Sequence, residues 1–221
     1  MTQNLKIWSN SFADLAAIPA EYAFGVHDAQ SHVTLSQNRN PHLAWSGVPT
    51  ATQSLALICH DRDVPSRGDD VNQEGRSIPA SLPRVDFFHW VLIDLPADAA
   101  AVAAGEFSHA VTPRGKGGPA FARADGSIVR QGINDYTGWF AGDKDMGGDY
   151  YGYDGPCPPW NDSVVHHYVF TLYALNVPFL ELHADVEKRF TGADVLRAME
   201  GKILAQTSIT GRYSLNPAVP V

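Results

Sequence analysis

Apolar and polar residues alternate in blocks along this chain, and the apolar blocks predict β-strands. Residues 54–59 and 87–95 are almost continuously apolar, and residues 168–177 are dense in aromatic and β-branched side chains. Apolar runs of this length are typical of strands that are covered on both faces. Shorter patterns predict further strands over 42–45 and 207–213. The chain is therefore expected to be mainly β.

A helix is indicated near the C-terminus. Thr191 and Asp194 have the spacing of a capping box, with Asp in the place of the usual Glu. Leu196, Met199 and Ile203 follow on one helical stripe. The pattern predicts a mainly β domain with one or two short peripheral helices near the C-terminus.

Length and charge narrow the function classes. The chain has 221 residues and 44% hydrophobic residues, which is enough for one domain with a sizeable core. Its net charge is −8, and it lacks the basic cluster that binding to duplex nucleic acid or to an acidic membrane usually needs. No apolar run reaches the roughly 18–20 residues of a membrane span, and the first residues do not resemble a signal peptide. We therefore expect a cytoplasmic protein in which Cys59 and Cys157 are reduced.

Polar side chains gather where the predicted strands end. Asp61 and Asp63 follow the first buried strand, and His89 lies inside the second. Strand ends and loops on a rigid sheet are common positions for binding groups. Taken alone, however, a histidine in a buried strand is more often a core residue with satisfied hydrogen bonds than a ligand or a catalyst.

An adjacent histidine pair opens the third strand. Because successive side chains of a strand point to opposite faces, His166 and His167 cannot both line one pocket. Tyr168 shares a face with His166. We expect one histidine of the pair to be functional and the other to face solvent.

The polar motifs occur in an order that resembles the phosphatidylethanolamine-binding protein family, which includes the Raf kinase inhibitor protein, and particularly its bacterial branch. The matching segments are PHLAWSGVP (41–49), SLALI (54–58), DRDVP (61–65), FHWV (88–91), NDY (134–136), GYDGPCPP (152–159) and HHYVF (166–170). Single matches are weak, but their common order is specific. The sequence departs from the family pattern at Arg62, where a proline is usual, and at His167, where an arginine is usual.

The resemblance implies an antiparallel β-sandwich of a large and a smaller sheet in one domain over 1–221. Relative to compact bacterial members, residues 66–86 and 137–151 look like insertions. The resemblance also implies a small pocket at one end of the sandwich for phosphate-like anions or phosphoryl head groups, including phospholipid-derived ones. The residues that match the family's pocket, with its framing loop and Tyr168 beside it, are Asp61, Asp63, His89, Gly155, Pro156, His166 and Tyr168. No catalytic residue, metal or cofactor follows from it.

A plausible chemistry for such a pocket uses histidine as the donor. Imidazole N–H groups donate to phosphate oxygens, and a neighbouring carboxylate fixes the tautomer of a histidine. We therefore expect Asp61 or Asp63 to orient His89, and His166 to bind the anion directly. Arg62 would supply a further cationic group if it faced the pocket.

Other readings stay open at this point. The Asp and His residues could serve a hydrolase, with or without a metal, although no known metal or nucleophile motif is present. Residues 143–154 partly follow a calcium-loop pattern, for which a solvated acidic loop is the simpler interpretation. The family's kinase-inhibiting members suggest a protein-interaction role, and bacterial members suggest a homodimer.

Overall fold

A computed structural model describes residues 4–185 and 187–221. Within these residues the strands form a six-stranded sheet of order β11-β10-β5-β6-β9-β8, a three-stranded sheet of order β1-β4-β7 and a β2–β3 hairpin. The strands are β1 (Lys6–Trp8), β2 (Gly25–Asp28), β3 (His32–Leu35), β4 (Leu43–Ser46), β5 (Ser54–Pro65), β6 (Arg84–Pro96), β7 (Ala101–Val102), β8 (Ala120–Ala122), β9 (Ile128–Gln131), β10 (His166–Leu175) and β11 (Ile203–Tyr213). The helices are the 3-10 turn η1 (Ala20–Tyr22), α1 (Tyr136–Trp139) and α2 (Gly192–Ala198). Among the described residues, no helix is both long and apolar enough to span a bilayer.

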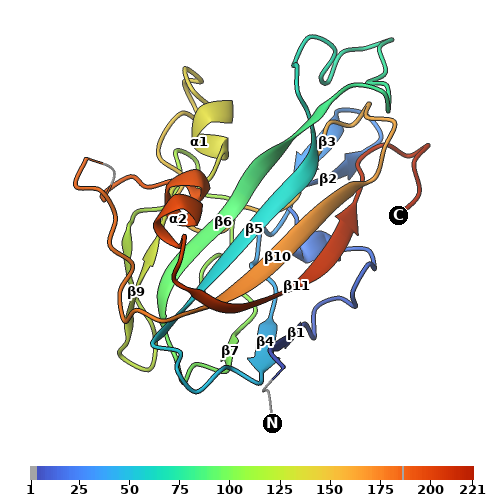
Figure 1. Cartoon of the computed structure of the whole chain (residues 1–221). Helices are drawn as coiled ribbons and strands as arrows, with labels where there is room; N and C mark the ends of the chain where they lie inside the picture. Colours follow the sequence, from blue (N-terminus) through green and yellow to red (C-terminus); the bar gives the residue numbers. More distant parts are fainter. Residues whose placement is uncertain (1–3, 186) are drawn as a thin grey trace.

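The predicted antiparallel β-sandwich is confirmed. Every strand pair in the sheets is antiparallel, and the long strands β5, β6, β10 and β11 run side by side across the molecule (Figure 1). The main core lies between the large sheet and the small one, where Trp45 of β4 packs in one cluster with Leu57, Trp90 and Phe170. A buried cluster on the other face of the large sheet contacts α2 through Val195 and Met199.

The strands extend beyond the apolar runs that predict them. β5 continues through the polar residues 60–65, and β6 begins at Arg84 rather than after the predicted loop of 66–86. Strand pairing explains the difference, because the polar end of β5 still pairs with the adjacent strands β10 and β6. Asp61, for example, lies opposite both Tyr168 and Phe87. Asp61 is therefore held by a sheet instead of by a loop.

The C-terminal helix is shorter than its apolar stripe. The capping box is present, since the Thr191 hydroxyl accepts from the Asp194 N–H and the Asp194 carboxylate accepts from the Thr191 N–H. The chain leaves the helix after Ala198, and Gly201 adopts a φ of 73°, a conformation that favours glycine. Ile203, which was expected on the helix, instead begins β11.

The long β5–β6 connection is fixed to the chain before β10. The Asn161 amide donates to the carbonyls of Asp70 and Arg76, and its oxygen accepts from the Asn72 N–H at 3.0 Å. Ile78 forms a bridge with Asp162. This connection forms the protruding top of the molecule in Figure 1.

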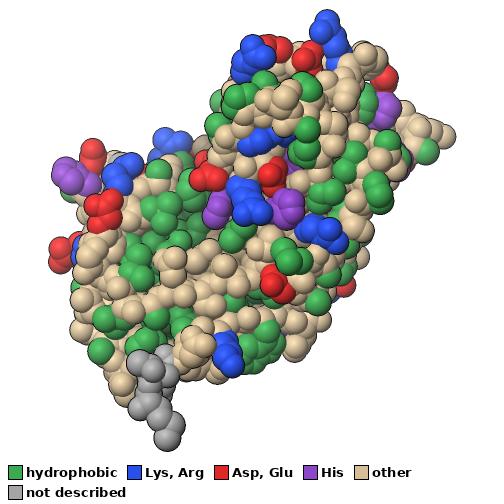
Figure 2. Space-filling view, turned by 45° about the vertical axis from the view of Figure 1, so that its right-hand side comes forward, with side chains coloured by type: hydrophobic (Ala, Val, Ile, Leu, Met, Phe, Trp, Pro, Cys, Tyr) green, Lys and Arg blue, Asp and Glu red, His purple; other side chains and the backbone are tan. Residues whose placement is uncertain are grey.

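The structure shows the state of the two cysteines and of the histidines on the outer face of the large sheet. Cys59 and Cys157 are free thiols. On the large sheet's outer face, His167 bonds Asp63 at 2.8 Å and His60 lies 3.9 Å from Asp86. Figure 2 shows acidic, basic and histidine side chains interleaved below the protruding top.

Candidate functional site

A cavity of about 360 Å³ lies at the end of the large sheet from which the β5–β6 connection projects. Strands β5, β6 and β10 supply one wall, and α1, residues 66–72 of the β5–β6 connection and the segment 157–159 supply the others. Four of its polar lining residues lie close together and are called the polar floor: Asp61, His89, His166 and Tyr168.

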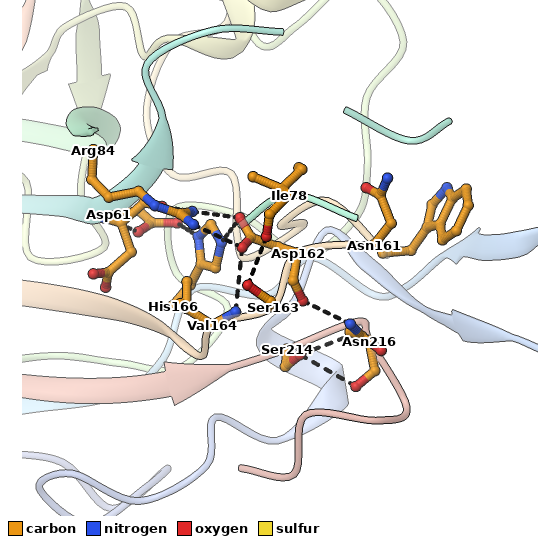
Figure 3. A network of polar contacts seen from close by, with 12 residues as sticks. Asp61, Ile78, Arg84, Asn161, Asp162, Ser163, Val164, His166, Ser214 and Asn216 are labelled. Carbon is orange, nitrogen blue, oxygen red and sulfur yellow. Dashed lines mark hydrogen bonds and ion pairs between the residues drawn. The ribbon is translucent and has the colours of Figure 1, made fainter. Parts of the chain in front are cut away.

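The polar floor is fixed by a buried ionic network (Figure 3). His166 Nδ1 lies 2.6 Å from Oδ2 of Asp61, and its Nε2 lies 3.1 Å from Oδ2 of Asp162. Both terminal nitrogens of Arg84 donate hydrogen bonds to the carboxylate of the same Asp162, at 2.5 and 3.0 Å. Arginine stays protonated in proteins, so this network contains at least one permanent cation.

His166 is the second cation of the network. Burial on its own would lower the pKa of His166, but hydrogen bonds to Asp162 and Asp61 outweigh it and raise the pKa to about 9. Burial would likewise raise the pKa of Asp61 and Asp162, yet the bonds from His166 hold both pKa values below the ordinary range. At neutral pH, two carboxylates are thus balanced by Arg84 and the His166 imidazolium.

This arrangement differs from the expectation that His166 binds an anion directly. Both of its ring N–H groups already donate to carboxylates, so neither remains for a ligand. Its side chain lines the cavity, but its contacts make it a positioning group for Asp61.

Asp162, which sequence reasoning missed, is itself tightly held. Its Oδ1 accepts from the Val164 N–H at 3.3 Å, and its carbonyl accepts from the Asn216 amide at 2.7 Å. The next residue, Ser163, donates its hydroxyl to the carbonyl of Ile78. The network therefore ties together the segment before β10, the β5–β6 connection and the C-terminal segment (Figure 3).

The sequence predicts that Asp61 or Asp63 orients His89. In the structure a backbone carbonyl orients it instead. Its Nδ1 lies 2.7 Å from the carbonyl of Asp154 and must donate to it, while the Asp154 N–H donates to the His89 carbonyl at 3.0 Å. Burial lowers the pKa of His89, although the charge of Asp61 opposes this. The ring is therefore neutral at pH 7. Nε2 is left as a lone-pair acceptor without a partner in the described part of the chain.

Asp154 is in turn anchored from several segments. Its carboxylate accepts from the amides of Asn38 and Asn134 at 2.7 and 2.8 Å and from Lys116 Nζ at 2.7 Å. These bonds satisfy a fully buried carboxylate and fix the carbonyl that orients His89.

The Tyr168 hydroxyl is the unusual atom of the polar floor. Tyr168 is 1% exposed, and its ring centroid lies 5.0 Å from that of His89. Its hydroxyl makes no hydrogen bond of normal geometry to a described residue, although the Asp61 carboxylate lies close to it. Burial, and then the charge of Asp61, raise the pKa of Tyr168 well above its ordinary value, so the hydroxyl keeps its proton. An unpartnered buried donor is costly in a folded protein.

Asp63 does not line the cavity. The β5–β6 register shifts between Asp61 and Val64, and the Asp63 N–H donates to Oδ1 of Asp61 at 2.8 Å. This irregularity sends the Asp63 carboxylate to the outer face, where it accepts from the backbone and ring of His167. The two carboxylates of the DRDVP segment thus serve opposite faces of the sheet.

Gly155 and Pro156 shape the site from behind the cavity wall. A Cβ on Gly155 would lie 2.1 Å from the carbonyl oxygen of Tyr22, so only glycine fits there. The Gly155 carbonyl accepts from the Tyr136 hydroxyl at 2.9 Å, and the Pro156 carbonyl accepts from the Phe24 N–H. Both residues thereby position aromatic side chains that do line the cavity.

The sequence motifs did not predict the aromatic side of the cavity. We call it the aromatic annex, and it comprises Phe24, Phe87, Tyr136, Trp139 and Phe140. Phe87 could have been found, because it lies two residues before His89 and shares its face of the strand. The annex residues of α1 could not, since a helix of one turn leaves no periodicity in a sequence.

The structure gives no support to a calcium loop at 143–154. Asp143 uses its Oδ1 to accept the N–H groups of Asp145 and Met146 at 2.8 Å, which forms a local turn. Over 4–185 and 187–221, no group of three or more His, Cys, Asp or Glu side chains could hold a metal ion.

Comparisons with known proteins identify the family to which this chain belongs. The sequence model of the family described as phosphatidylethanolamine-binding protein matches residues 8–214. The chain belongs to this family. Curated relatives include a UPF0098 protein of Methanothermobacter thermautotrophicus, 32% identical over 95% of this chain and 97% of the relative. Another is UPF0098 protein YbhB of Escherichia coli, 28% identical over 95% of this chain and all of the relative.

Solved structures of the family share the fold. A phosphatidylethanolamine-binding protein homologue from Chlamydia trachomatis, CT736, superposes with a TM-score of 0.60 at 25% identity, covering 96% of this chain and 98% of its own. Escherichia coli YbcL gives a TM-score of 0.61 at 23% identity, over 95% and 98% of the two chains. The family-level sandwich therefore extends over nearly the whole of this chain.

Proposed function

We propose that this member of the phosphatidylethanolamine-binding protein family binds a small phosphoryl-containing ligand in the cavity, with the head group on the polar floor. The observation that carries the proposal is the unpartnered Tyr168 hydroxyl beside the partner-free Nε2 of His89. A phosphoryl group in its monoanionic form offers an acceptor oxygen for the first and an O–H donor for the second. The family's name supports this ligand class.

The charge balance of the site is compatible with an anion. Asp61 and Asp162 are offset by His166 and Arg84, so a phosphoryl group meets no net negative charge from this network. The bound head group shares one proton with Nε2 of His89. Binding therefore requires the monoanion or a proton taken up by His89, and it weakens as the pH rises above the second pKa of the phosphoryl group, which is about 6 for a phosphate monoester.

Removing the Tyr168 hydroxyl is the direct mutational test. With inorganic phosphate as the probe, Tyr168→Phe is expected to bind at least about tenfold more weakly than the wild-type protein, because a hydrogen bond to a charged group contributes about 1.5–3 kcal/mol. The hydroxyl makes no regular hydrogen bond to any residue that the structure describes, so the variant should be at least as stable as wild type. Affinity is measured by NMR titration.

The matched control is Tyr173→Phe. Tyr173 lies on the same strand but packs against the cluster beneath α2, away from the cavity. This variant should bind phosphate as wild type does. Equal phosphate affinity in wild type and Tyr168→Phe would contradict the proposal, and so would the absence of phosphate binding by wild type.

A further inference from the structure

The cavity is too large and too apolar for a phosphoryl head group alone. Its volume of about 360 Å³ lies in the range of sites for drug-sized ligands, roughly 300–1,000 Å³. The head group on Tyr168 and His89 would occupy only the polar floor, and the aromatic annex would remain beside it.

A continuous series of rings leads from the polar floor into the annex. The His89 centroid lies 5.0 Å from that of Phe87 and 5.5 Å from that of Tyr136. Tyr136 stacks on Phe24 at 4.6 Å and on Phe140 at 5.6 Å, with interplanar angles of 17° and 15°. A planar ring attached to the head group would therefore meet aromatic faces and edges at favourable spacings.

Trp139 marks the open end of the annex. It lines the cavity, yet it is 53% exposed, although its neighbour Tyr136 is buried and bonded to Gly155. An exposed indole at the rim of an apolar cavity is a surface that a ligand can cover.

The wall that the β5–β6 connection supplies is fixed before a ligand arrives. Val71 and Asn72 of the β5–β6 connection line the cavity, and Asn72 exchanges hydrogen bonds with Asn161 and Trp160 at 3.0 and 3.1 Å. The next wall segment, 157–159, carries two prolines. A preformed cavity loses little conformational freedom on binding, which favours a rigid ligand of matching shape.

We infer that the ligand is an aryl phosphate monoester or a compound of that chemistry, with a planar aromatic body in the annex and its phosphoryl group on Tyr168 and His89. This inference rests on the proposed function for the head group and adds the class of its body. It assigns Phe140 and Trp139 to specificity for the aromatic body, and it leaves the polar floor to the phosphoryl group.

Two monoesters with the same head group test the inference. We compare methyl phosphate with 1-naphthyl phosphate by calorimetric titration. Because only the second buries aromatic surface, 1-naphthyl phosphate should bind at least about tenfold more tightly. Trp139→Ala should remove most of this advantage and leave the affinity for methyl phosphate unchanged.

A remote exposed tryptophan provides the control. Trp8 lies on β1 and is 43% exposed, so Trp8→Ala should change neither affinity. The inference is overturned if 1-naphthyl phosphate binds no more tightly than methyl phosphate, or if Trp139→Ala keeps the full advantage. Binding of both esters with equal affinity would leave the proposed function standing. Binding of neither ester would overturn the proposed function as well.

Discussion

Replacing His166 by leucine is expected to lower the free energy of unfolding by about 3–5 kcal/mol, the usual cost of removing one partner from a buried ion pair. His166 is fully buried, and each of its ring nitrogens is bonded to a carboxylate. The leucine variant leaves Asp61 close to Asp162 without the cation between them. Arg84 still contacts Asp162 but has no bond to Asp61.

Urea unfolding at pH 6.5 measures this loss. His183→Leu is the matched control, because the His183 side chain is exposed and its one bond within residues 4–185 and 187–221 is to the exposed Asp185. Surface substitutions of this kind usually change stability by no more than about 0.5 kcal/mol. A loss below about 1 kcal/mol for His166→Leu would show that the network does not hold the cavity floor.

Alkaline pH should weaken the same network without any mutation. The pKa of His166 is about 9 in the folded protein and near 6.5 when unperturbed. A raised pKa means that the stabilisation is fully present below about 6.5 and is lost as the pH rises through about 9. The difference of about 2.5 pKa units corresponds to about 3 kcal/mol.

Two other histidines act in the opposite direction. Burial lowers the pKa of His89 and of His60, so their contributions are fully present above about 6.5 and decline as the pH falls below it. Stability is therefore expected to be greatest near pH 6.5. Between pH 6.5 and pH 9.5, urea unfolding should show a loss of stability that is about 3 kcal/mol larger in wild type than in His166→Leu. The buried thiols of Cys59 and Cys157, whose pKa values are raised by burial, add an equal alkaline loss to both proteins. Parallel losses in the two proteins would contradict the assignment to His166.

The central strands could be predicted from the sequence, because an apolar run indicates a buried strand whichever strand it pairs with. The 54–59 and 87–95 runs lie in adjacent central strands, and the family motifs supplied the sandwich around them. The ends of these strands could not be predicted in the same way. Residues 60–65 are polar, and only pairing with β6 and β10 keeps them in the sheet.

The candidate site was predictable in its location but not in its hydrogen bonds. Tyr168 was found because it shares a strand face with His166. The role of Asp63 was missed, because one irregularity between Asp61 and Val64 reverses the direction of its side chain. Asp162 was missed because its approach to His166 depends on the path of a loop, which no residue pattern encodes.

Nitrogen NMR of the histidine rings during addition of inorganic phosphate at pH 7 tests the central claim most directly. If the phosphoryl group shares a proton with His89, the Nε2 signal of His89 should move from its unprotonated position toward the protonated one. The ring signals of His166 should stay in the protonated position throughout, because both N–H groups already donate to carboxylates. A His89 signal that does not move while phosphate saturates the protein would contradict the account.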